Sequence, residues 1–347
     1  MYENRKTLYN IAKDEIQIQI KIYLNLVEIT NNFENLSVES ISSREEIVIL
    51  LAGKGSYLDP NTTTAEEAII EWERRQAVPF DLEASITKGV YIKLRKIAEQ
   101  YFDDLSEATN SFTEFDARFI HENPFYLPFL QHIGGVFSKS KLKKLVGPVS
   151  DNNVSLKAAI RLANYLNERT DPKGIRKGEV LGRLGATLEG IVRDLAGRIL
   201  LESMVANALE LEGLAFKREN EYEHLKGVVY DFRADFILPD AHNPKVFIEV
   251  RKSSSRHASL YAKDKMFSAI NWKGKNKNLL RVLVVDGSWT ASTLDVMTRV
   301  FDYVIPIDKV SKLAKTISAY LQGDNSKLKW IIDFKISKNI KMTKNKK

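Results

Sequence analysis

Residues 228–253 read VVYDFRADFILPDAHNPKVFIEVRKS, two segments rich in β-branched and aromatic residues that flank a short polar turn. Such segments form strands, and the turn residues PDAHNP at 239–244 predict that the two strands pair as a hairpin. Asp235 lies in the first predicted strand and Glu249 in the second. We therefore expect the hairpin to bring these two carboxylates close together.

Apolar runs surround both acids, at 236–238 after Asp235 and at 246–248 before Glu249. A carboxylate inside an apolar strand is costly unless a partner compensates its charge. A divalent cation is the natural partner, and Mg²⁺ binds through one or two carboxylates together with water and substrate phosphate. We predict that Asp235 and Glu249 are ligands of Mg²⁺.

The segments around the hairpin alternate between helix and strand. A run without proline at 186–211 predicts one long helix or two in succession that end at Gly213, a typical stop signal. Further elements are expected as a strand at 214–223, a helix at 259–270, a buried strand at 279–285, a helix at 292–303, a short strand at 304–305 and a helix at 308–321. This order predicts an α/β fold with a mixed central sheet flanked by helices.

The preceding part of the chain reads as mainly helical. Ser43 and Glu46 have the spacing of a capping box, and residues 86–102 show the recurrence of an amphipathic helix. We divide the chain into a helical region at 1–180, an α/β domain at 181–322 and a basic tail at 323–347.

Composition restricts the classes of function. The 347 residues are 44% hydrophobic and include no cysteine, which excludes disulfides, cysteine-based zinc sites and a cysteine nucleophile. Neither a signal peptide nor a membrane span is evident, so a soluble, cytoplasmic protein is expected.

The net charge of +7 is concentrated in two segments. Residues 323–347 hold eight lysines and two aspartates, and residues 251–277 hold eight basic residues and one aspartate. Concentrated positive charge favours phosphate backbones, although a solvated tail is an equally good interpretation of the last lysines.

A third acid is expected near the hairpin. Glu202 lies on the predicted helix that leads into the strands, and Glu189 on the same helix is its rival. Glu202, Asp235 and the run IEVRK at 248–252 resemble the PD-(D/E)XK nuclease superfamily over about residues 185–290.

The resemblance implies a restriction-endonuclease-like core and magnesium-dependent cleavage of DNA phosphodiesters. In it Asp235 and Glu249 correspond to the metal ligands and Glu202 to the acid on the helix. The rest of the chain is similar to the helical additions of type II restriction endonucleases. A site-specific endonuclease of double-stranded DNA that works as a homodimer is therefore expected, with residues 1–180 serving recognition or dimerisation.

One residue departs from the family pattern. Arg251 stands where the family usually has lysine, and arginine stays protonated and cannot act as a base. It can still orient the attacking water or stabilise charge on phosphate. Strand alternation places Arg251 on the face of Glu249 and Lys252 on the opposite face. Lys252 is a candidate catalytic residue if a bulge turns it toward the site. Lys263 or Lys265 on the next helix could instead supply the amine that the family's usual lysine provides.

Two other functions remain open from the sequence. One is a repair or mobile-element nuclease without a fixed recognition site. The other is a DNA-binding relative without cleavage, which Arg251 favours.

Two polar clusters are candidates for DNA contacts. Ser254, Arg256 and His257 follow the second strand of the hairpin, and Lys273 and Lys275 precede the next strand. Hydroxyl groups and cations of this kind suit phosphate contacts. A helix-capping loop and a solvated turn are the alternative interpretations.

Overall fold

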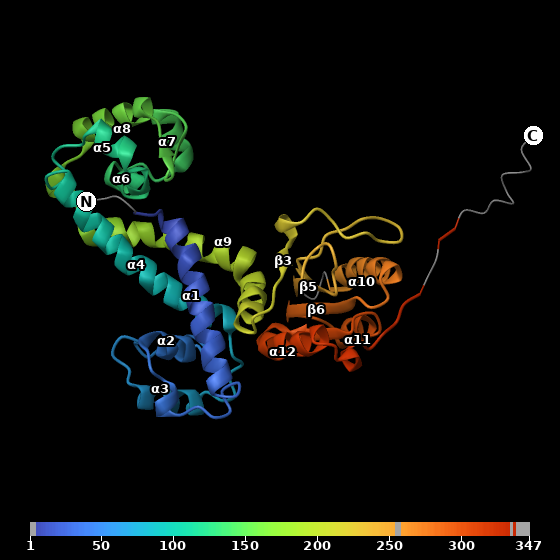
Figure 1. Cartoon of the computed structure of the whole chain (residues 1–347). Coiled ribbons are helices and arrows are strands. Elements are labelled where there is room, and N and C mark those ends of the chain that lie inside the picture. Colours follow the sequence, from blue (N-terminus) through green and yellow to red (C-terminus); the bar gives the residue numbers. More distant parts are fainter. Residues whose placement is uncertain (1–4, 254–257, 334–335, 338–347) are drawn as a thin grey trace, which may run out of the picture. The chain divides into compact units, whose positions relative to one another are not determined.

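A computed structural model describes residues 5–253, 258–333 and 336–337 (Figure 1). The chain divides into two compact units, residues 1–200 and residues 201–347. Helix α9 (Lys177–Leu211) contributes its first part to the N-terminal unit and its last turns to the C-terminal unit. The boundary predicted near residue 180 lies at the start of this helix.

The N-terminal unit is helical, as expected, apart from one short two-stranded ladder. Its helices before α9 are α1 (Leu8–Ile29), α2 (Arg44–Gly53), α3 (Ala65–Arg74), α4 (Leu82–Ala108), α5 (Ala117–Glu122), α6 (Leu127–Ile133), α7 (Lys139–Val146) and α8 (Leu156–Arg169). The ladder pairs β1 (Val149–Ser150) with β2 (Asn153–Val154). Within the described residues, no helix combines the length and apolarity that crossing a bilayer requires.

Local sequence signals account for several of these helices. The capping box at the start of α2 forms as predicted: Ser43 Oγ accepts a hydrogen bond from the Glu46 amide (3.3 Å), and the Ser43 amide donates to Glu46 Oε2 (2.9 Å). The amphipathic pattern at 86–102 falls within α4, where Val90 and Leu94 are fully buried. Helix α9 ends before Gly213, whose φ of 68° suits glycine.

The C-terminal unit is an α/β structure with a mixed sheet. After the end of α9 come β3 (Lys217–Arg218), β4 (Phe236–Leu238), β5 (Val246–Ser253), α10 (Ala258–Lys275), β6 (Leu280–Gly287), α11 (Ala291–Thr298), β7 (Tyr303–Pro306) and α12 (Val310–Leu321). The five strands pair in chain order. The pairs β3–β4 and β4–β5 are antiparallel, whereas β5–β6 and β6–β7 are parallel. The predicted hairpin and the mixed sheet are thus both confirmed.

The structure shortens three of the predicted elements. The strand expected over 214–223 is regular only at β3. The first hairpin strand, expected over 228–238, is regular only at β4. Before β4, Asn271 of α10 takes the backbone groups: its Oδ1 accepts from the Val229 amide (2.7 Å) and its Nδ2 donates to the Tyr230 carbonyl (2.8 Å). The helix expected over 292–303 ends at Thr298, and Tyr303 begins β7 instead.

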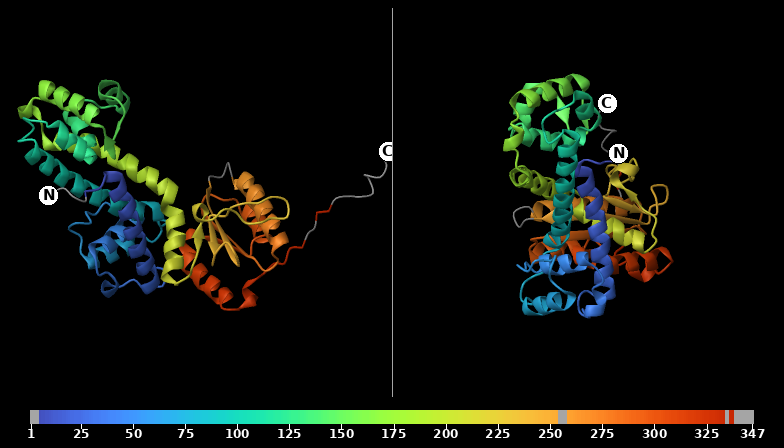
Figure 2. Two further views of the ribbon diagram at one scale, coloured as in Figure 1. Left: turned by 45° about the horizontal axis from the view of Figure 1, so that its top comes forward. Right: turned by 90° about the vertical axis from the view of Figure 1, so that its left-hand side faces the viewer.

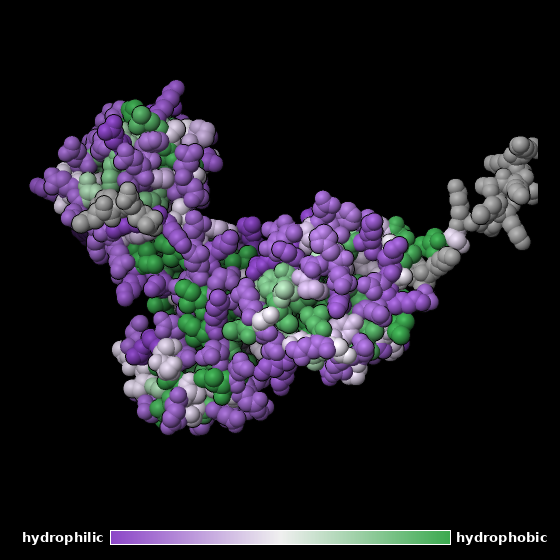
Figure 3. Space-filling view, viewed as in Figure 1, coloured by the Kyte–Doolittle hydropathy of each residue, from purple (hydrophilic) through white to green (hydrophobic). Residues whose placement is uncertain are grey.

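Apolar side chains fill the space between the sheet and its helices. Strand β6 is buried along Leu280–Val285, as its apolar run predicts. Phe247 of β5 packs edge-on against Trp272 of α10, with ring centroids 4.6 Å apart. Helices α10 and α11, which connect the parallel strands, both contribute side chains to the hydrophobic cluster that contains Phe247 and Trp272. Helix α12 lies on the side of the sheet opposite α10 (Figure 2). Hydrophilic residues cover most of the visible surface of each unit (Figure 3).

A buried ion pair fixes the chain that follows α12 to the sheet. Asp302 Oδ2 accepts from Arg281 Nε (3.1 Å), and both side chains are fully buried. Asp302 Oδ1 also accepts from the backbone amides of Lys329 (2.8 Å) and Trp330 (2.9 Å). The start of the predicted basic tail therefore belongs to the folded unit.

Replacing Asp302 is expected to destabilise the C-terminal unit strongly. Asp302→Ala leaves Arg281 buried without its counter-charge, which costs about 3–5 kcal/mol of unfolding free energy. Urea unfolding followed by tryptophan fluorescence measures this loss. Asp295→Ala is the matched control, because Asp295 pairs with Arg299 on the exposed surface of the same unit (2.8 Å), and such a pair contributes only about 0.5 kcal/mol. Equal losses in the two variants would contradict the structural role of Asp302.

Candidate active site

The hairpin places Asp235 and Glu249 opposite one another. Phe236 pairs with Ile248 across β4 and β5, so the next pair outward is Asp235 with Glu249. Asp235 lies on a bend directly before β4, where its Oδ2 accepts a hydrogen bond from the amide of Val250 (2.6 Å). Asp235 is 8% exposed and Glu249 is completely buried. The two acids thus lie side by side across β4 and β5.

The Arg251 guanidinium lies between the acids. Its Nη1 donates to the Val250 carbonyl (2.8 Å) and to Asp235 Oδ2 (3.3 Å), and its Nη2 donates to Glu249 Oε2 (3.3 Å). Arg251 therefore shares the face of Glu249, as strand alternation predicts. Lys252 lies outside this cluster and pairs instead with Asp286 of β6 (3.6 Å). The structure thus does not bring Lys252 into the site.

Helix α10 supplies a lysine to the same cluster. Lys265 Nζ lies 2.7 Å from Glu249 Oε2, and the residue is 5% exposed. Lys263, the other lysine considered on this helix, is exposed to solvent. Of the two, Lys265 is therefore the amine that the structure brings to the carboxylates.

Glu202 is the third acid of this neighbourhood. Burial by surrounding protein atoms and the negative charge of Asp235 raise its pKa, while Arg218 and Arg251 act in the opposite direction. Glu202 is nevertheless exposed to solvent.

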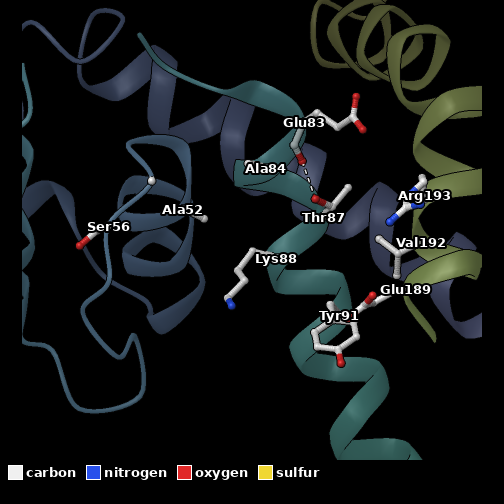
Figure 4. Close-up of a pocket in the computed structure, with 11 residues that line it drawn as sticks. Ala52, Ser56, Glu83, Ala84, Thr87, Lys88, Tyr91, Glu189, Val192 and Arg193 are labelled. Carbon is white, nitrogen blue, oxygen red and sulfur yellow. Dashed lines mark hydrogen bonds between the residues drawn. The ribbon is translucent and has the colours of Figure 1, made fainter. Parts of the chain in front are cut away.

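Glu189, the rival of Glu202, belongs to the N-terminal unit. There it lines a cavity of about 440 Å³ together with Lys88, Tyr91 and Arg193 from helices α4 and α9 (Figure 4). This cavity mixes acidic and basic side chains.

The predicted DNA contacts have different outcomes. Ser254, Arg256 and His257 lie outside the described residues. Lys275 is exposed, as a phosphate contact requires. The prediction for Lys273 is wrong, because this side chain is fully buried and its Nζ donates to the Leu279 carbonyl (2.9 Å). Burial lowers the pKa of Lys273 to about 8. Lys273 anchors the end of α10 to the start of β6.

Sequence reasoning missed Tyr222. Its hydroxyl donates to the Ala234 carbonyl (2.8 Å) and accepts from the Ala234 amide (2.5 Å), immediately before Asp235. Burial raises the pKa of Tyr222, and the negative charge of Glu249 adds to that rise. Tyr222 thereby fixes the backbone that carries Asp235. A tyrosine next to a short strand gives no sequence signal for this role.

The surroundings of Glu249 compensate its negative charge only in part. Burial first, and then the negative charge of Asp235, raise its pKa to about 7, although Lys265 and Arg251 act to lower it. Its Oε1 is buried and has no hydrogen-bond partner. A carboxylate oxygen buried without a partner is costly, and a bound cation would satisfy it.

The oxygens at the cluster fit the ligands that Mg²⁺ prefers. Asp235 Oδ2, Glu249 Oε2 and the Val250 carbonyl converge on one guanidinium, and hard oxygen donors of this kind suit Mg²⁺. Among the described residues, no group of three or more acidic or histidine side chains forms a complete metal cage. Two carboxylates with water and phosphate are nevertheless a common arrangement for Mg²⁺.

Comparison with known proteins adds no relative: no protein-family model, curated protein or solved structure matches this chain. The chemistry of the site therefore rests on its geometry.

The raised pKa of Glu249 predicts how stability depends on pH. Without metal, Glu249 holds its proton up to pH about 7 in the folded state, but only up to about 4.5 in the unfolded state. The folded state thus binds the extra proton between these values, so this contribution to stability is complete below pH 4.5 and is lost as pH rises through 7. We expect the unfolding free energy of Glu249→Gln, relative to the wild type, to increase between pH 5 and 7.5.

Urea unfolding in EDTA at several pH values tests this expectation. The comparison between variant and wild type cancels the contributions of other titrating groups. A difference that stays constant over this range, or that decreases with pH, would show that the pKa of Glu249 is not raised in the folded state.

Proposed function

We propose that this protein is a magnesium-dependent endonuclease that hydrolyses phosphodiester bonds of double-stranded DNA, with a PD-(D/E)XK-like core and the specificity of a type II restriction enzyme. The observation that carries the proposal is the convergence of Asp235 Oδ2, Glu249 Oε2 and the Val250 carbonyl on a single cationic group, with the Lys265 ammonium 2.7 Å from Glu249.

The element order supports this core. The end of α9, the antiparallel strands β3, β4 and β5, then α10 and the parallel strand β6 follow the order helix, strand, strand, strand, helix, strand that the resemblance implies. The two carboxylates lie on the second and third of these strands or directly beside them, and Glu202 lies on the first helix.

Each residue of the cluster has a distinct part in the proposed reaction. Asp235 and Glu249 hold the cation, which when bound stabilises negative charge on the phosphate and increases the acidity of water. Lys265 would hold Glu249 in position and orient the attacking water through its N–H donors. Arg251 stays protonated and stabilises phosphate charge rather than accepting a proton. Glu202 is the proposed proton acceptor, because a raised pKa makes a carboxylate a better base.

Basic side chains of the C-terminal unit are proposed to contact the DNA backbone. Lys263 and Lys275 are exposed on α10, and the polar segment that contains Ser254, Arg256 and His257 remains a candidate by its sequence. Recognition of a palindromic site would require two copies of the chain, because the symmetry of the site is matched by that of the protein. The helical N-terminal unit is proposed to serve recognition or dimerisation.

One observation favours a second candidate, a DNA-binding relative that does not cleave. Arg251, at the position of the usual lysine, contacts the same oxygens that would bind the metal. If this contact were permanent, the cation would be excluded.

Digestion of plasmid and phage DNA tests the proposed function. We expect discrete fragments with Mg²⁺ and none in EDTA. Asp235→Ala and Glu249→Ala should abolish cleavage, because each removes a metal ligand. Lys265→Met should slow cleavage by about 10²–10³-fold, the usual loss when one preorganised donor is removed. Lys312→Met, on the exposed surface of α12, is the control and should cleave normally.

The other outcomes decide between the alternatives. A smear that requires the same residues would indicate a nuclease without site specificity. DNA binding without cleavage of any duplex would identify the inactive relative and contradict the proposed function.

A further inference from the structure

The side chain of Arg251 folds back along its own strand. Instead of extending toward solvent, its guanidinium donates to oxygens of three residues: Asp235, Glu249 and Val250. Two of these oxygens belong to carboxylates that are almost completely buried. The guanidinium thus takes the place, and part of the ligand set, that a divalent cation at these oxygens would need.

Electrostatics explains why the metal-free protein adopts this arrangement. Two adjacent buried carboxylates repel one another, and removing their charges from water is costly. Arg251 and Lys265 both favour the ionised form of Glu249. Of the two cations, only Arg251 can leave easily, since its side chain is 31% exposed while that of Lys265 is 6% exposed. Arginine is also less strongly hydrated than lysine and suits contacts with two carboxylates at once.

We propose that Arg251 is a built-in competitor of the divalent cation: in the metal-free protein its guanidinium occupies the cation position, and metal binding requires it to rotate out toward solvent. The inference rests on the metal site of the proposed function. It reconciles Arg251 with that site, because a displaced guanidinium becomes free to bind a DNA phosphate while the cation takes over its oxygens.

Competition of this kind weakens metal binding, because the guanidinium must leave the site before the cation can bind. The apparent affinity falls by the fraction of molecules in which the guanidinium has already left the site. If the guanidinium has left the site in about 1–10% of molecules, the apparent affinity is lower by about 10–100-fold. Removal of the Arg251 charge should therefore tighten metal binding by about 10–100-fold.

Metal titrations of the full-length protein without DNA test the proposal. Mn²⁺ binding is followed by electron paramagnetic resonance of the free ion, and Mg²⁺ binding by calorimetry. Both are measured at pH 8. Arg251→Met removes the charge but keeps an unbranched side chain, and we expect it to bind Mn²⁺ about 10–100-fold more tightly than the wild type. Arg251→Lys keeps a positive charge and should gain much less.

Arg233→Met is the matched control. Arg233 is exposed in the same unit and its contact with Glu219 is long (3.8 Å), so its loss should leave metal affinity unchanged. Unchanged or weaker binding by Arg251→Met would overturn the proposal, and so would an equal gain in the control, which would indicate a general effect of net charge.

A measurement on the wild-type protein guards against misfolding of the variant. The Nε–H resonance of Arg251, assigned by its absence in Arg251→Lys, should shift on addition of Mg²⁺, and its exchange with water should accelerate. A resonance that stays unchanged at saturating Mg²⁺ would contradict displacement.

These results separate the inference from the nuclease assignment. Tighter metal binding by Arg251→Met without cleavage of any DNA would keep the competition and reject the nuclease. Mg²⁺-dependent cleavage by the wild type with unchanged metal affinity in Arg251→Met would do the reverse. Absence of metal binding in every form would reject the competition.

Discussion

The contact between Glu249 and Lys265 joins the central strand to helix α10, and the arrangement of the candidate site depends on it. Glu249 is completely buried in the central strand β5, and the Lys265 ammonium lies 2.7 Å from it. An ionised carboxylate buried without a counter-charge would cost several kcal/mol, so the Lys265 ammonium stabilises Glu249 whenever Glu249 is ionised. Apolar residues of α10 pack on the sheet beside this contact. Chemistry and packing are therefore determined by one arrangement.

The fold was predictable wherever its cause is local in sequence. The capping box of Ser43 and Glu46 needs only four residues, and the apolar run of β6 needs only burial on both faces. Prediction failed where a distant residue intervenes. The first hairpin strand is shortened because Asn271, some forty residues along the chain, takes the backbone groups at Val229 and Tyr230. No periodicity within residues 228–238 contains that information.

In the candidate site, too, the features with a local cause were predictable, and those that depend on distant residues were not. The hairpin and strand alternation placed Asp235, Glu249 and Arg251 correctly relative to one another. The sequence also contained an unused signal for Lys265, since Ala262, Lys265, Ala269 and Trp272 recur at helical spacing on the buried stripe of α10, where Lys263 does not fall. The burial of Lys273 and the backbone contacts of Tyr222 depend on the folded environment, and residue type alone predicts neither.

We propose that the oxygens that contact Arg251 form a divalent cation site. Anomalous scattering from crystals soaked in Mn²⁺ tests it most directly. A peak about 2.0–2.6 Å from Asp235, Glu249 and the Val250 carbonyl, with the Arg251 guanidinium moved away, is the predicted result. Crystals that hold Mn²⁺ elsewhere, with the guanidinium still between the two carboxylates, would contradict both the metal site and the function built on it.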